Sequence, residues 1–122
     1  MNQFDQNSIY RSCQKLLSAV VALAIEDAQV EPIKIGRARL QKEPRDIAIT
    51  AVRFLFTDDS DGYLVALNID PKQFRTRLMD AMYSKNNKLI KNQRAMVFNY
   101  QFVYKNYSAM NWDSLHKEYP SP

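Results

Sequence analysis

The sequence has 122 residues, of which 46% are hydrophobic, and it carries a formal net charge of +4. This length provides for one domain with a modest core. The single cysteine, Cys13, excludes a disulfide within the chain and favours a reducing compartment. Two glycines in the whole chain favour helices over sheets and tight turns.

A long helix is predicted from about residue 7 or 8 to residue 29. Apolar side chains repeat there at helical spacing, at Ile9, Cys13, Leu16, Val20 and Ala24. We expect Cys13 to be a buried, inert thiol, because no neighbour would activate it. The apolar run 16–25 is too short to span a bilayer, which needs roughly 20 residues, so no membrane partner is predicted.

Residues 32–44 form a basic connection that proline and glycine interrupt. Within it, residues 37–42 are either a short helical turn or part of a solvated linker. A second helix is predicted from about residue 44 or 45 to residue 56. Its buried face is expected to carry Ile47, Ala51, Phe54 and Leu55.

Two helices joined by a tight turn are predicted over residues 60–84. The first covers about 60–67 and stops at Asn68, a residue type that tolerates left-handed backbone. The second begins at Pro71, with Asp70 as its N-cap and Gln73 completing a capping box. The acidic residues 58–61 precede the first helix, where carboxylates are favourable. They fit a calcium loop poorly, because Thr57 would then occupy the first ligand position.

The segment 89–107 fits either a helix or a strand, since its aromatic residues alternate while its apolar residues also recur at helical spacing. A helix is favoured, because no other stretch resembles a strand that could pair with it. A short docking helix is expected over 112–119. The sequence therefore predicts a mostly α-helical fold, a compact single domain over 1–122 with about five helices. Its parts are a packing helix (1–31), a basic connection (32–44), a helix with the helix–turn–helix unit (44–84) and an aromatic, basic C-terminal segment (85–122).

The run from Ala66 to Leu78 resembles the helix–turn–helix core of many phage and bacterial DNA-binding proteins. By that register Leu67, Ile69, Phe74 and Leu78 occupy the packing positions. Over roughly its first two thirds the chain is also similar to a loose group of small phage and prophage proteins. The resemblance implies a phage origin and a location in the cytoplasm of a bacterial host, but no mechanism.

Two functions remain open at this point. The first is a DNA-binding regulator, in which helix 71–84 enters the major groove and basic side chains meet base edges or phosphates. The residues expected to do so are Lys72, Gln73, Arg75, Thr76, Arg77, Lys85, Lys88, Lys91 and Arg94.

The second function is a module that binds and modulates a host protein, with the helix–turn–helix as scaffold. Its contacts would come from the aromatic residues Tyr100, Tyr104, Tyr107 and Trp112, which otherwise pack in the core. A homodimer is compatible with either function. An enzyme is not expected, because the chain has one histidine, no Ser/His/Asp set and no phosphate loop. No cofactor or metal is predicted.

Overall fold

The computed structural model describes residues 4–33, 43–85, 88–107 and 112. These residues are mostly helical, as the sequence predicts. The elements in chain order are α1 (Phe4–Asp27), α2 (Asp46–Phe56), the 3-10 turn η1 (Asp58–Ser60), α3 (Asp61–Ala66), α4 (Pro71–Tyr83) and α5 (Gln93–Asn106).

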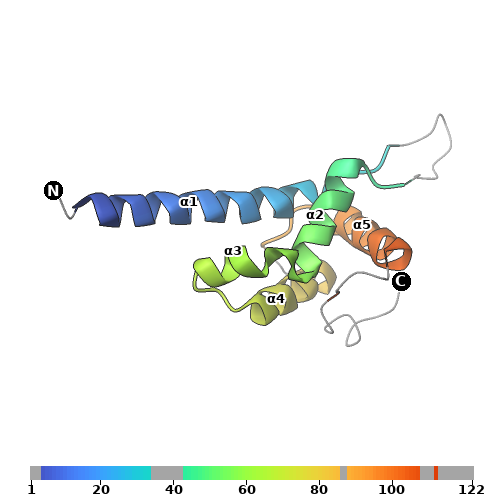
Figure 1. The fold of residues 1–122 in the computed structure, drawn as a ribbon. Coiled ribbons are helices and arrows are strands. Elements are labelled where there is room, and N and C mark those ends of the chain that lie inside the picture. The colour runs from blue at the N-terminus through green and yellow to red at the C-terminus, as the bar shows by residue number, and fades with distance from the viewer. Residues whose placement is uncertain (1–3, 34–42, 86–87, 108–111, 113–122) are drawn as a thin grey trace.

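Helix α2 lies at the centre of the arrangement (Figure 1). It crosses the C-terminal part of α1 and also packs against α5, while α4 packs against α5 and α3. The amphipathic pattern of α2 explains this position, because Ala48, Val52, Leu55 and Phe56 are all buried. Helices α4 and α5 complete the core with Leu78, Met79, Met82, Met96 and Val103.

The N-terminal half of α1 projects beyond the rest of the fold (Figure 1). Ile9 and Leu16 are 63% and 67% exposed there, and Cys13 is exposed too. The prediction of a buried thiol is therefore wrong. Helical periodicity identified an apolar stripe, but it did not show whether the fold supplies anything to cover that stripe.

Ile47, at the start of α2, also departs from expectation, since it was placed on the buried face and is 49% exposed. The core begins one residue later, at Ala48, which is fully buried. Ile47 instead lines a groove between α1 and α2, with Val20 and Leu23 of α1.

Polar side chains join the end of α1 to the start of α5. The Gln29 Oε1 atom accepts hydrogen bonds from the backbone N–H groups of Lys91 and Asn92, both at 2.8 Å. The buried Asn99 amide donates to the backbone carbonyls of Ala28 and Val30, at 2.8 and 2.9 Å. These bonds satisfy backbone groups that helix ends leave free. They also hold α5 and the residues just before it against the C-terminal end of α1.

The helix predicted for 89–107 is confirmed as α5, and the strand alternative is excluded. The turn predicted at 37–42 and the docking helix at 112–119, apart from Trp112, lie outside the described residues. Trp112 itself forms an isolated antiparallel bridge with Thr57. No helix in the described part of the chain is both long and apolar enough to cross a membrane.

Candidate nucleic-acid interface

The turn before α4 follows its predicted chemistry. Asn68 adopts φ 60°, the left-handed conformation that asparagine tolerates better than most residues. The N–H of Ile69 then donates to the Leu64 carbonyl at 2.8 Å, which closes the end of α3. The Asp70 carboxylate accepts from the Gln73 N–H at 3.0 Å, with Pro71 in the first turn. The start of α4 is thus fixed by local sequence.

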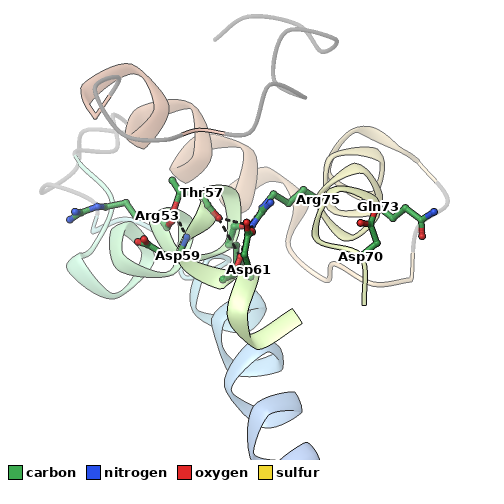
Figure 2. A network of polar contacts seen from close by, with 9 residues as sticks. Arg53, Thr57, Asp59, Asp61, Asp70, Gln73 and Arg75 are labelled. Carbon is green, nitrogen blue, oxygen red and sulfur yellow. Dashed lines mark hydrogen bonds and ion pairs between the residues drawn. The ribbon is translucent and has the colours of Figure 1, made fainter. Parts of the chain in front are cut away.

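Arg75 ties α4 to the end of α2 and the start of α3 (Figure 2). Its side chain is 4% exposed. Its Nε donates to the Leu55 carbonyl at 3.0 Å, and its Nη2 donates to the Thr57 carbonyl at 2.6 Å. The same Nη2 donates to Ser60 Oγ at 3.0 Å and forms an ion pair with Asp61.

This network has a simple physical origin. Helix α2 ends at Phe56, so its last carbonyls have no partner within the helix. The Arg75 guanidinium supplies donors to two carbonyls there, and its positive charge is favourable at a helix C-terminus. Arg75 therefore acts as a C-terminal cap for α2, brought in from 20 residues along the chain.

The prediction that Arg75 meets DNA is corrected by this burial. A guanidinium that is enclosed and bonded to Leu55, Thr57, Ser60 and Asp61 does not reach a base edge or a phosphate. Thr57, whose carbonyl accepts from Arg75, is buried at 1% exposure.

The outer face of α4 carries the other predicted contact residues. Lys72, Gln73 and Arg77 are exposed, and Thr76 is half-buried. Gln73 points away from the Arg75 network, on the other side of the helix (Figure 2). Asp80 is also exposed on α4, so this helix alone has little net charge.

Four exposed cations lie just beyond α4. Lys85, Lys88, Lys91 and Arg94 are all exposed, in the connection from α4 to α5 and the first turn of α5. The sequence from 81 to 112 contains five Lys or Arg residues and no Asp or Glu. We call Lys85, Lys88, Lys91 and Arg94 the basic connection of α4 and α5, as distinct from residues 32–44. A positively charged segment of this kind suits contact with a polyanion.

Among the acidic residues 58–61, the Asp61 side chain has a structural role. Asp61 pairs with Arg75. The Asp59 N–H donates to Thr57 Oγ1 at 3.3 Å, which caps the 3-10 turn. Among the described residues, no group of three His, Cys, Asp or Glu side chains lies close enough to hold a metal ion.

The aromatic residues of the C-terminal segment pack on the fold. Tyr100 is 3% exposed, with its ring 4.8 Å from that of Phe56. Tyr104 stacks on it at 6.0 Å, and the Trp112 indole donates to the Tyr107 carbonyl at 2.8 Å. The prediction that Tyr100 binds a partner is therefore wrong, because burial in the core leaves it no free surface. Tyr104, Tyr107 and Trp112 are half-buried.

Sequence reasoning missed the junction of Arg75, Thr57 and Ser60, because its contacts bridge separate elements. The one available signal was an arginine on the apolar side of α4, between Phe74 and Leu78. Comparison with models of protein families, with curated proteins and with solved structures found no match.

Proposed function

We propose that this chain is a small DNA-binding regulator that uses the outer face of α4 together with the basic connection of α4 and α5. The observation that carries the proposal is the exposure of these side chains. Lys72, Gln73 and Arg77 are exposed on α4, and four exposed cations follow that helix along the chain in a stretch, 81–112, that contains no Asp or Glu.

The two parts of the surface have different tasks. Lys85, Lys88, Lys91 and Arg94 would neutralise phosphates, which supplies affinity without sequence information. Lys72, Gln73 and Arg77 lie on a helix whose start is fixed by its cap and turn, as direct reading of base edges in the major groove requires.

The Arg75 network supports this assignment in two ways. It holds α4 against α2 through buried bonds, so that the outer face has a defined position. It also pairs the carboxylate of Asp61, which lowers the repulsion that this acidic segment would exert on a nearby phosphate backbone.

The alternative, a module that binds a host protein through its aromatic C-terminal segment, has less support. Tyr100 is in the core, and its neighbours Tyr104 and Trp112 pack edge-on against each other at 5.2 Å. A phage origin rests on the sequence resemblance alone.

The test is binding to short duplex DNA, followed by fluorescence anisotropy over a range of salt concentrations. We expect the affinity of the wild type to fall steeply with salt. A Lys85→Ala, Lys88→Ala, Lys91→Ala variant should bind more weakly, and the slope of log K against log salt should shrink by about 3, roughly 0.9 for each lost phosphate contact.

A matched control is the pair Arg11→Ala and Lys15→Ala, which removes two exposed cations from α1. This variant should retain the wild-type slope. Gln73→Ala should keep the slope while changing the preferred sequence. The proposal fails if the wild type does not bind duplex DNA at low salt, or if the α1 control lowers the slope per removed cation as much as the triple variant does.

A further inference from the structure

A groove lies where α1, α2 and α3 meet. Helix α2 crosses α1 near its C-terminal end, and α3 also contacts α1 (Figure 1). The groove has a volume of about 490 Å³, which is within the range of small-molecule binding sites. Its lining comes from all three helices, so the groove is a feature of the folded chain and not of one helix.

The walls of the groove are apolar and aromatic. Val20 and Leu23 line it from α1, and Ile47 lines it from α2. Phe54 and Tyr63 line it too, with their ring centroids 5.1 Å apart and their planes at 79°, an edge-to-face pair. Walls of this kind shield the apolar part of a ligand from water, and the face of an aromatic ring also attracts a cation.

The charged side chains that line the groove are both carboxylates. Asp27 is the last residue of α1 and is half-buried, and Asp46 is the first residue of α2 and is exposed. Among the described residues, no ion pair joins either carboxylate to a cation, and no lysine or arginine lines the groove. The groove is therefore negative, although the chain as a whole carries a net charge of +4.

The end of α1 adds to this negative potential. The C-terminal end of a helix carries a partial negative charge, and the last turn of α1 contains no basic residue that would offset it. A cation in the groove would thus meet two carboxylates and a helix C-terminus, whereas an anion would be repelled by all three.

We infer that the groove binds a small hydrophobic cation, a molecule with an apolar body and one positive charge. The walls formed by Val20, Leu23 and Ile47 would hold the body, and the Phe54 and Tyr63 rings would contact it from α2 and α3. The carboxylates of the groove would neutralise the charge. An apolar lining with a few charged groups is the usual composition of a small-molecule site.

The groove is separate from the proposed DNA interface. Residues 72–77 and 85–94 do not line it. The inference is therefore independent of the proposed function, and its failure would leave that function untouched.

The test uses two probes of the same shape and opposite charge, tetraphenylphosphonium and tetraphenylborate. Binding to the full chain is measured by isothermal titration calorimetry, and the site is located from changes in backbone amide resonances. We expect saturable binding of tetraphenylphosphonium, with shifts concentrated at residues 20–27, 46–54 and 63. Tetraphenylborate should bind in the groove more weakly by at least about tenfold, because the two carboxylates repel it.

Two variants separate the groove from the overall charge of the chain. Asp27→Asn combined with Asp46→Asn removes both charges at nearly constant side-chain size, and it should weaken the binding of tetraphenylphosphonium by more than about tenfold. Glu26→Gln is the matched control, because Glu26 is exposed at the same end of α1 but does not line the groove. This control should retain the wild-type affinity. Circular dichroism shows whether each variant remains folded.

Three results would overturn the inference. The first is the absence of saturable binding of tetraphenylphosphonium to the wild type. The second is equal affinity of the two probes for the groove, which would show that the carboxylates do not select the charge of the ligand. The third is a loss of affinity in Glu26→Gln as large as in the double variant, which would show that overall charge, and not the groove, attracts the cation.

Discussion

Replacing Arg75 should be among the most destabilising single changes in this chain. Arg75→Met keeps most of the apolar stem and removes every donor of the guanidinium. Three buried acceptors then lose their arginine donor, the Leu55 and Thr57 carbonyls and Ser60 Oγ. The Ser60 hydroxyl, 3.4 Å from either carbonyl, has one proton and replaces the guanidinium only in part. Each buried acceptor left without a donor costs about 1 kcal/mol or more.

The expected loss in the free energy of unfolding is therefore about 3–4 kcal/mol, a large part of the roughly 5–15 kcal/mol typical of a domain. The ion pair adds little to this figure. The Asp61 side chain is 45% exposed, so water can solvate its carboxylate once the arginine is gone. Asp61→Asn, which keeps an oxygen in place, should cost about 1 kcal/mol or less.

Urea unfolding followed by Trp112 fluorescence and by circular dichroism measures both variants. The account predicts a much lower midpoint for Arg75→Met and a small change for Asp61→Asn, with similar m-values. Equal losses for the two variants would show that the ion pair, and not the capping of α2, supplies the stability. A loss below about 1 kcal/mol for Arg75→Met would refute the reasoning altogether.

Three further predictions concern single side chains. Asn68→Val should lower the free energy of unfolding by about 1–2 kcal/mol, because a β-branched residue is strained at φ 60°, whereas Asn68→Gly should be nearly neutral in the same urea titration. Asn99→Asp should lower the free energy of unfolding by about 3 kcal/mol or more near neutral pH, because a buried carboxylate would face two backbone carbonyls at the end of α1. A loss below about 1 kcal/mol would contradict the observed hydrogen bonds. Burial raises the pKa of Tyr83 above 10.0, opposed by a hydrogen bond with the Gln101 side chain, so the proton is held more tightly in the folded state. The resulting stability is present below the ordinary tyrosine pKa and is lost as pH rises through the pKa of the folded state. Tyr83→Phe should therefore reduce the fall in the free energy of unfolding at alkaline pH. Equal slopes of that free energy against pH for the two proteins would contradict this prediction.

Local chemistry explains why the start of α4 was predictable. Asp70 and Pro71 act on the backbone within one turn, so their pattern has the same meaning wherever the helix later packs. Of the predicted capping box only the Asp70 half forms, because the Gln73 side chain points away from the turn. The left-handed turn at Asn68 was predictable for the same reason. The choice of a helix for 93–106 also held, since the described residues offer no strand with which it could pair.

Contacts between distant elements were not predictable in this way. Arg75 was expected to meet DNA because it is a basic residue on the helix predicted to enter the major groove. The carbonyls that bury it belong to the end of α2, and only the tertiary fold brings them within reach. Likewise, periodicity marked Leu16 as apolar, but the absence of a covering element is a property of the assembled fold.

The central claim is that the outer face of α4 and the basic connection of α4 and α5 contact DNA. The most direct measurement is the change in backbone amide resonances of the chain when short duplex DNA is added. The account predicts shifts concentrated at 72–77 and 85–94, with residues 9–23 of α1 unaffected. Shifts confined to α1, or no shifts at low salt with DNA in excess, would contradict it.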